Sequence, residues 1–324
     1  MRRFAFFILT IFLLIGLVGG GVLVWGFAQY IKPGPTVTKN IVVIPEGSNV
    51  DSIAEILKSE GVIYDSMIFR LGVRLSRVDK KLQAGEFAFP HGVSAKGVAE
   101  VLIRGETVIR RLTIAEGMTS FQVFDQLVAT NGLEETFDVP LEGSILPETY
   151  YFSYGDMRSD LVKRMVQAMD DSLNQLWQKR ASGLPFKEPE EALILASIVE
   201  KETGLKEERA RIAGVFINRL KKGMRLQSDP TVVYGLNKGD GPLGRQLLRS
   251  DLKKKTPYNT YTINGLPPGP ICNPGLAAIR AVLHPQKTDE LYFVADGKGG
   301  HVFTTSLKEH NRNAAKWRKI RDSN

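Results

Sequence analysis

The chain has 324 residues, enough to bury a sizeable core and to form more than one domain. Hydrophobic residues make up 43% of it and charged residues 24%, an ordinary globular composition that excludes a disordered chain. The net charge of +8 invites a nucleic-acid interpretation. However, the basic residues cluster at 219–225, 249–255 and 308–321 without an aromatic-rich binding motif. We therefore expect solvated basic faces near an anionic surface, and no nucleic-acid partner.

The first thirty residues are strongly apolar, and no charged side chain lies between Arg3 and Lys32. A helix needs about 20 apolar residues to span a membrane, whereas the apolar part of a secretory signal has only about 7–15. No persuasive cleavage site precedes Lys32, so an uncleaved anchor is favoured over a cleaved signal. Arg2 and Arg3 predict a cytoplasmic N-terminus. Trp25 and Tyr30 suit the outer membrane interface.

Two segments resemble each other at a shift of seventy positions, residues 42–63 and residues 112–133. Each predicts a short strand, a glycine turn (Gly47 or Gly117), a polar N-cap (Asn49 or Thr119) and an amphipathic helix. This opening resembles small wall-binding LysM modules, in which a strand pair packs against two helices. A generic α+β packing unit without a ligand is the alternative.

The predicted fold class is α+β: a transmembrane helix, a LysM-like small α+β unit and a larger mixed α/β domain. We expect a cytoplasmic tail at 1–3, the anchor at 4–31, a linker at 32–40, the small unit at 41–105 and the larger domain at 106–324. Helices are predicted at 64–76, 94–104, 157–179, 188–203 and 206–222, a strand within 82–89, and a hairpin of 291–297 with 301–306 before a basic C-terminal helix. Gly204 is the expected C-cap between two of these helices.

Several kinds of chemistry are disfavoured. The four histidines, His91, His284, His301 and His310, have no zinc-site spacing, and neither a P-loop nor a G-x-S-x-G elbow is present. We therefore expect no metal and no cofactor. The single Cys272 cannot form an internal disulfide. Ser250 and Lys253 match an S-x-x-K pattern, but its companion motifs are missing and a helix N-cap explains Ser250.

The segment ALILASIVEKETG, residues 192–204, places two acids at the end of an apolar helix. Burial and the negative end of the helix dipole both disfavour a charged carboxylate there, so an acid can stay partly protonated. Helical periodicity leaves open whether Glu200 or Glu202 is the buried one, and a solvated last turn is the alternative for both. Downstream, residues 225–236 and 256–275 are rich in Pro, Gly, Asn, Tyr and Thr. This composition predicts structured loops that suit sugar binding.

Four ordered motifs, ASIVEKET, LQSDPTVVYG, PYNTY and GLPPGPICNPG, resemble the endolytic murein transglycosylases, or YceG-like proteins. The resemblance covers nearly everything after the linker. It implies a membrane-anchored lytic transglycosylase that cleaves glycan strands of peptidoglycan outside the inner membrane, with peptidoglycan synthases (penicillin-binding proteins) as partners. It also implies that Glu200 is the catalytic acid; the neighbouring Glu202 has no catalytic role assigned by the resemblance. Candidates for sugar contacts, chosen by residue type, are Gln227, Asp229, Tyr258, Asn259, Tyr261 and Asn273.

The resemblance implies cleavage of the β-1,4 bond between N-acetylmuramic acid and N-acetylglucosamine, with formation of a 1,6-anhydro end. One carboxyl group suffices, because the sugar's own C6 hydroxyl is the nucleophile. Two other classes stay open: a lysozyme-like muramidase, which needs a second carboxylate to activate water, and a non-enzymatic peptidoglycan-binding anchor.

Overall fold

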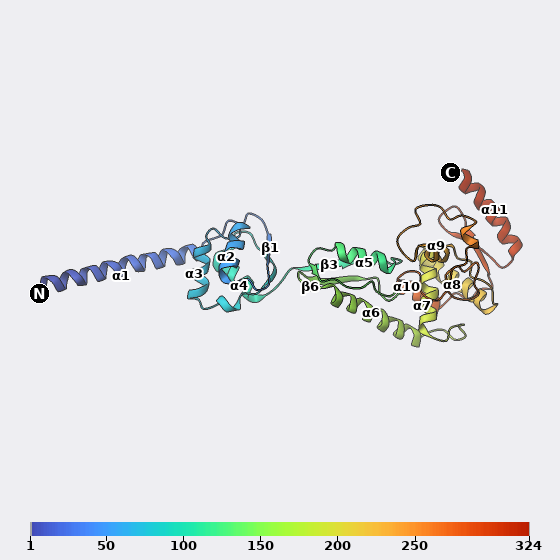
Figure 1. Ribbon diagram of the computed structural model, residues 1–324, viewed down its shortest axis with the longest axis horizontal. Coiled ribbons are helices and arrows are strands. Elements are labelled where there is room, and N and C mark those ends of the chain that lie inside the picture. Colours follow the sequence, from blue (N-terminus) through green and yellow to red (C-terminus); the bar gives the residue numbers. More distant parts are fainter. Residues whose placement is uncertain (1, 324) are drawn as a thin grey trace. The chain divides into compact units, whose positions relative to one another are not determined.

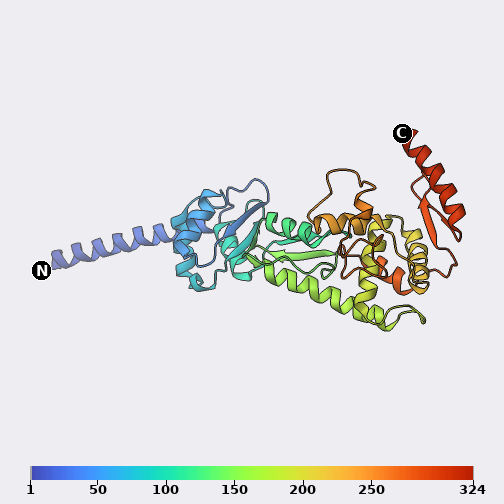
Figure 2. The same cartoon turned by 45° about the vertical axis from the view of Figure 1, so that its right-hand side comes forward.

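The computed structural model describes residues 2–323 (Figures 1 and 2). The chain forms two compact units. The first extends to Arg110 and includes Phe152–Gly155, and the second contains Arg111–Tyr151 and everything described from Asp156 onward. Helices and short two-stranded sheets occur together, so the predicted α+β class is confirmed.

The first unit contains an apolar helix followed by a strand pair and three further helices. Its elements are α1 (Arg2–Ile31), β1 (Asn40–Ile44), α2 (Val50–Ser59), α3 (Ser66–Leu75), the 3₁₀ turn η1 (Asp79–Lys81), β2 (Gly85–Phe89) and α4 (Ala95–Arg104). Strands β1 and β2 are antiparallel, with Asn40 opposite Phe89 and Ile44 opposite Gly85. The apolar face of this pair and the apolar faces of α2, α3 and α4 enclose one core that includes Phe69, Phe87 and Phe89.

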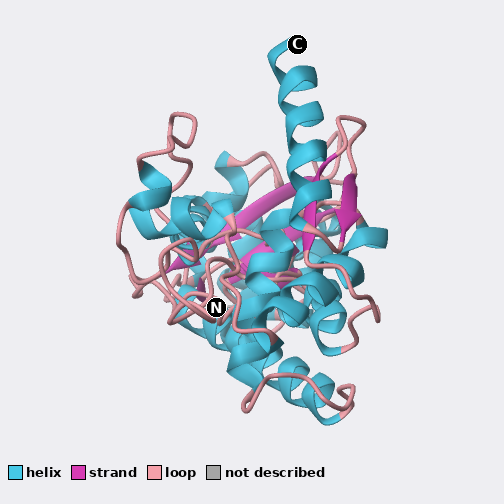
Figure 3. Cartoon of the chain, turned by 90° about the vertical axis from the view of Figure 1, so that its right-hand side faces the viewer, coloured by secondary structure: helices cyan, strands magenta, loops and turns pink. Residues whose placement is uncertain are grey.

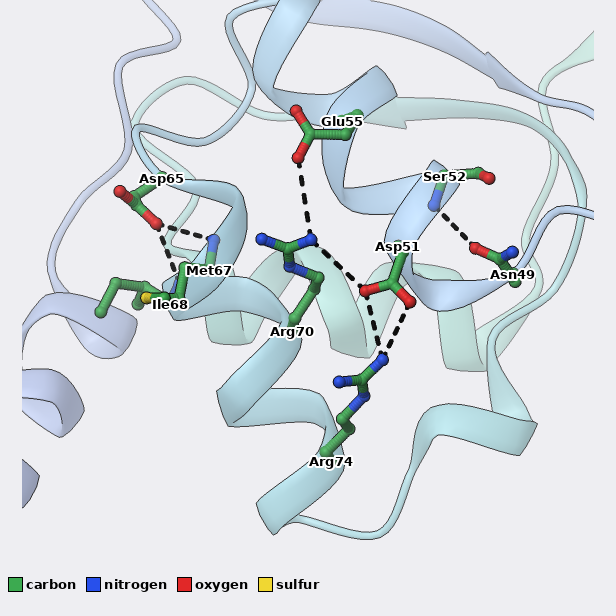
Figure 4. Close-up of polar contacts among 9 residues, drawn as sticks. All are labelled: Asn49, Asp51, Ser52, Glu55, Asp65, Met67, Ile68, Arg70 and Arg74. Carbon is green, nitrogen blue, oxygen red and sulfur yellow. Dashed lines mark hydrogen bonds and ion pairs between the residues drawn. The ribbon is translucent and has the colours of Figure 1, made fainter.

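Local sequence explains how the helices of the first unit begin. Asn49 caps α2 by accepting a hydrogen bond from the Ser52 amide, as its position predicts, and Asp65 caps α3 by accepting from the amides of Met67 and Ile68 (Figure 4). Between the two helices, Asp51 binds Arg74 at 2.9 Å and Arg70 at 3.4 Å (Figure 4). One side of α3 is therefore held to α2 by charge.

Helix α1 contains a continuous apolar stretch, Phe6–Ile31, that is long enough to cross a membrane. Its last turn is not free: Tyr30 is buried in the core of the first unit. The prediction that Tyr30 faces the outer interface is therefore wrong, because its ring packs over Gly72 of α3. Trp25 is exposed, so for this residue the membrane-interface position stays a prediction.

The second unit is mostly helical. Its elements are β3 (Ile109–Thr113), α5 (Ser120–Ala129), β4 (Leu133–Glu134), β5 (Thr149–Ser153), β6 (Asp156–Met157), α6 (Arg158–Gln178), α7 (Pro189–Glu202), α8 (Lys206–Lys221), α9 (Asp229–Asn237), η2 (Asp251–Lys253), α10 (Leu276–Leu283), β7 (Tyr292–Ala295), β8 (His301–Thr304) and α11 (Leu307–Ser323). Strands β3 and β5 pair with each other. Thr119 caps α5 with a capping box, so the second predicted strand–glycine–helix opening is confirmed.

The core of the second unit forms around α7. Seven of its residues are buried, Ala192, Leu193, Leu195, Ala196, Ser197, Ile198 and Val199, and α6, α8 and α10 pack against it. The predicted hairpin is present as β7 and β8, with Ala295 opposite His301, and α11 follows it and packs against it (Figure 3). This core fixes the end of α7, where the two candidate acids lie.

Three sequence-based expectations for the second unit are wrong. Gly204 does not form a left-handed cap: α7 ends at Thr203 in extended conformation. Residues 225–236 are not wholly loop, because Asp229-Pro230 begins α9, with proline in the first turn where its missing amide hydrogen is no loss. Arg219 is not on a solvated basic face but buried, since its guanidinium donates to the carbonyls of Leu226 and Leu291.

Candidate active site

The two acids at the end of α7 face different surroundings. Residues two apart on a helix point about 200° apart, so Glu200 and Glu202 cannot share an environment. The extended Thr203 then turns the chain toward α8, which packs against α7. The two carboxyl groups therefore have different hydrogen-bond partners.

The carboxyl group of Glu200 contacts polar groups of α8 and of the residue before α10. Its side chain is 5% exposed, and it binds the guanidinium of Arg209 at 3.1 Å and the backbone amide of Gly275 at 3.0 Å. Arg209 also reaches Glu116 at 3.4 Å. Burial raises the pKa of Glu200, while the Gly275 amide and the Arg209 charge oppose that rise. This carboxylate ties α7 to α8 and to the start of α10.

Glu202 has a different set of neighbours. The hydroxyl of Ser228 donates a hydrogen bond to its Oε1 at 2.5 Å. Its pKa is raised to about 7, first because burial disfavours the charged form. The nearby carboxylate of Asp229 raises this pKa as well, whereas the hydrogen bond from Ser228 and the charge of Arg219 lower it. Glu202 therefore carries a proton for a large fraction of the time at neutral pH.

Glu202 lines a groove of about 450 Å³. The other walls come from the segment before α9, the hairpin and the C-terminal helix: Arg219, Leu226, Gln227, Asp229, Tyr261, Tyr292, Phe293, Val294, Leu307, His310 and Asn311. The groove is of the size that binding pockets for small ligands have, and both polar and apolar side chains line it. Glu200 does not line it.

The structure brings three of the six predicted sugar-contact residues into this groove. Gln227, Asp229 and Tyr261 line it together with Glu202. The hydroxyl of Tyr261 donates to Asp229 at 2.6 Å, and burial together with that carboxylate raises the pKa of Tyr261. Gln227 has a left-handed backbone, with φ of 53°, which a non-glycine residue adopts only under local constraint.

The two predicted asparagine contacts lie elsewhere. Asn259 is fully buried; its amide donates to the carbonyls of Leu252 and Lys254, and its oxygen accepts from the Tyr261 amide. Asn273 is also fully buried, and its oxygen accepts from the Ile145 amide. Both side chains form hydrogen bonds with backbone groups of neighbouring loops. We therefore assign them a role in stabilising those loops.

Tyr258, the remaining candidate, packs against Tyr234 with ring centroids 4.7 Å apart. Tyr234 and Asp229 line a second groove, of about 490 Å³, with Lys201, Pro230 and Val233 among its other walls. Asp229 thus borders both grooves. An extended ligand that passes Glu202 has a continuation available on the other side of Asp229.

Sequence reasoning missed Ser228, Arg219 and His310 as site residues. Ser228 lies inside the LQSDP motif, so its polar character beside Asp229 was an available signal. Arg219 and His310 carried no such signal, because they reach the groove from α8 and α11, 91 positions apart in the chain. No cluster of three metal-ligating side chains occurs in the described range 2–323.

A carboxyl group with a raised pKa, placed in an open groove with tyrosine, carboxylate, amide and guanidinium groups, is the arrangement that acid-catalysed glycoside-cleaving enzymes use. Comparison with known proteins gives the same class. The chain belongs to the YceG-like family, whose model matches residues 42–316.

Among similar proteins, the endolytic murein transglycosylase of Bacillus subtilis is 33% identical, over 93% of this chain and 91% of that protein. The endolytic murein transglycosylase of Streptococcus pneumoniae serotype 2 is 31% identical over 85% of this chain, which spans 57% of that longer relative. A crystal structure of a YceG-like protein from Listeria monocytogenes matches 85% of this chain and 98% of its own, with 33% identity and a TM-score of 0.54.

Proposed function

We propose that this protein is a peptidoglycan lytic transglycosylase whose general acid is Glu202. The observation that carries this function is the groove at the end of α7, which holds a carboxyl group of pKa about 7 beside Asp229, Tyr261 and Gln227. The names of its relatives, endolytic murein transglycosylases, support the reaction class.

The geometry favours Glu202 over Glu200, the acid that the family resemblance implied. A general acid must reach the oxygen that it protonates, within about 2.6–3.2 Å. Glu200 is ion-paired with Arg209 and does not line this groove, so a substrate bound in the groove would have to break that pair to reach it. Glu202 lines the groove, where the Ser228 hydroxyl donates a hydrogen bond to its Oε1.

In the first step, protonated Glu202 donates its proton to the glycosidic oxygen between N-acetylmuramic acid and N-acetylglucosamine. The C1–O bond of the muramic acid breaks, the N-acetylglucosamine leaves as an alcohol, and positive charge develops at C1. The carboxylate of Asp229, oriented by the Tyr261 hydroxyl, stabilises that charge.

In the second step, the carboxylate of Glu202 takes the proton of the C6 hydroxyl of the same muramic acid. The C6 oxygen attacks C1, the 1,6-anhydro ring closes, and Glu202 is again protonated for the next cycle. Because the nucleophile belongs to the substrate, effective molarities of about 10⁵ M or more let it outcompete water. The Ser228 hydroxyl stabilises the charged form between the two steps.

A muramidase is the second candidate, and one observation favours it: Asp229 supplies a second carboxylate in the same groove. Mass analysis of the fragments that the enzyme releases from purified glycan strands separates the two reactions. A transglycosylase leaves anhydro ends that are lighter by one water molecule than the reducing ends of a hydrolase. Fragments with reducing ends alone would replace the proposed reaction by hydrolysis, and unchanged strands would leave only a binding anchor.

The remaining parts of the proposal concern place and partners. We propose that α1 anchors the chain in the inner membrane with the N-terminus in the cytoplasm, and that cleavage within nascent strands terminates their growth next to peptidoglycan synthases. We also propose that residues 41–105 are a LysM-like unit that binds glycan weakly; the pairing of β1 with β2 over α2 and α3 supports it. Residues 106–324 are the proposed catalytic domain.

A further inference from the structure

Helix α3 has an unusual exposed face. Phe69 and Val73 point into the core of the first unit and are fully buried. Residues near the opposite side of the helix would ordinarily be polar. Instead, that side carries Met67, Leu71 and Leu75, which are 60%, 49% and 72% exposed. The helix is therefore apolar on its outer face as well as its inner one.

The polar side of α3 is already occupied. Arg70 and Arg74 bind Asp51 of α2, and Arg70 also lies 3.9 Å from Glu55 (Figure 4). These ion pairs, together with the buried Phe69 and Val73, define which side of α3 faces outward. The apolar stripe is thereby held outward, because turning it inward would break them.

The stripe lies beside the outer end of the membrane helix. Met67, Leu71 and Leu75 line a groove of about 260 Å³ together with Val22, Trp25 and Phe27 of α1. The two helices are packed tightly, since a Cβ placed on Gly72 would lie 2.4 Å from the Tyr30 ring. The position of α3 along α1 is therefore defined within this unit.

That position corresponds to the surface of a bilayer. At about 1.5 Å per residue, the roughly 20 residues that begin at Phe4 cross a hydrocarbon core about 30 Å thick. The count reaches Leu23, so Trp25, Phe27 and the neighbouring stripe lie where acyl chains meet headgroups. Directly after the stripe, Arg77, Lys80 and Lys81 are exposed and supply positive charge for anionic headgroups.

We propose that α3 is an interfacial membrane-binding helix, whose stripe of Met67, Leu71 and Leu75 dips into the outer leaflet beside α1. The occupant of the groove is lipid, because a side chain held next to the last turns of a spanning helix meets acyl chains before it meets any other molecule. This inference rests on the proposed membrane anchor. It adds a second attachment, which holds the first unit against the bilayer.

The test uses the full chain in bilayers of phosphatidylethanolamine and phosphatidylglycerol. Single cysteines at positions 67, 71 and 75 carry an environment-sensitive fluorophore; Cys272 is fully buried, so the unsubstituted chain serves as the labelling blank. The matched control is a label at Ile41, which is 49% exposed and lies on β1, away from α1 (Figure 1). The expected result is a blue-shifted emission and strong quenching by lipids spin-labelled near the carbonyl at 67, 71 and 75, with neither at 41.

A label at Leu17, in the middle of α1, separates this inference from the anchor. Quenching at 17 by a spin label deep in the acyl chain, without quenching at 71, would overturn the interfacial helix and leave the anchor intact. Absence of quenching at 17 would overturn both. As a further check, Leu71→Glu with Leu75→Glu alters only exposed side chains, and it should abolish the quenching of the label at position 67.

Discussion

The hydroxyl of Ser228 donates a hydrogen bond to the carboxyl group of Glu202 across 26 positions of the chain. This contact joins the end of α7 to the start of α9 and places the acid at the wall of the groove. It also tunes the acid, since a donated hydrogen bond stabilises the charged form and lowers a pKa that burial raises.

Glu202→Gln should abolish cleavage while leaving the fold intact. Glutamine keeps the size of the side chain but neither donates nor accepts the proton, and loss of general acid–base catalysis typically costs about 10²–10⁴-fold. The rate of release of anhydro fragments from glycan strands measures this.

Glu200→Gln is the matched comparison in the same turn. It weakens the ion pair with Arg209, so it should lower the melting temperature yet keep most of the activity and the same pH profile. The opposite ranking, with Glu200→Gln inactive and Glu202→Gln active, would return the catalytic role to Glu200.

Stability should depend on pH through Glu202. The raised pKa means that the folded state holds this proton more tightly than the unfolded state does. Its stabilisation is fully present below the ordinary pKa of 4.5 and is lost as the pH rises through about 7, a loss of about 3 kcal/mol. Thermal unfolding at pH 5 and pH 8 should show a smaller change for Glu202→Gln than for the unmodified chain. Glu190→Gln, in the exposed first turn of α7, should behave like the unmodified chain.

Ser228→Ala should shift the pH profile of activity. Without the Ser228 hydroxyl, the pKa of Glu202 rises further, so the alkaline limb of the profile moves to higher pH. Ser250→Ala is the control, since Ser250 is exposed and its side chain makes no capping hydrogen bond to the turn that follows. It should change neither limb, and a large loss of activity there would instead support the S-x-x-K interpretation.

Asn259→Ala should destabilise the second unit. Its amide donates hydrogen bonds to the carbonyls of Leu252 and Lys254, and its oxygen accepts one from the Tyr261 amide. Leaving such buried polar groups unpaired costs about 1–3 kcal/mol. Denaturant unfolding measures the loss. Asn264→Ala, at an exposed position, should cost far less. An Asn259→Ala protein of unchanged stability and impaired glycan binding would restore the direct sugar contact predicted from the sequence.

The topology has its own test. A reporter that is active only outside the cytoplasm, fused after Asn324, should be active in cells if the proposed orientation holds, since positive residues such as Arg2 and Arg3 favour a cytoplasmic N-terminus. A stable but silent fusion would contradict the proposed orientation.

Local patterns determined the elements of this protein. The apolar run of α1, the caps at Asn49 and Thr119, and the hairpin of β7 with β8 depend on residues close together in the sequence, so periodicity and capping preferences sufficed to predict them. Four motifs in order were enough to indicate the family. The local signal failed at Gly204, because Thr203 already leaves the helix in extended conformation.

Only the tertiary structure shows that Glu200 and Glu202 have different partners. Both lie in the last turn of α7, and the difference comes from partners far along the chain: the Gly275 amide donates to Glu200, whereas the Ser228 hydroxyl donates to Glu202, which lines the groove. The same holds for the loop residues. Composition marks Asn259 and Tyr261 alike as sugar ligands, but burial assigns Asn259 to the scaffold and leaves Tyr261 in the groove, because burial is set by packing between distant segments and not by residue type.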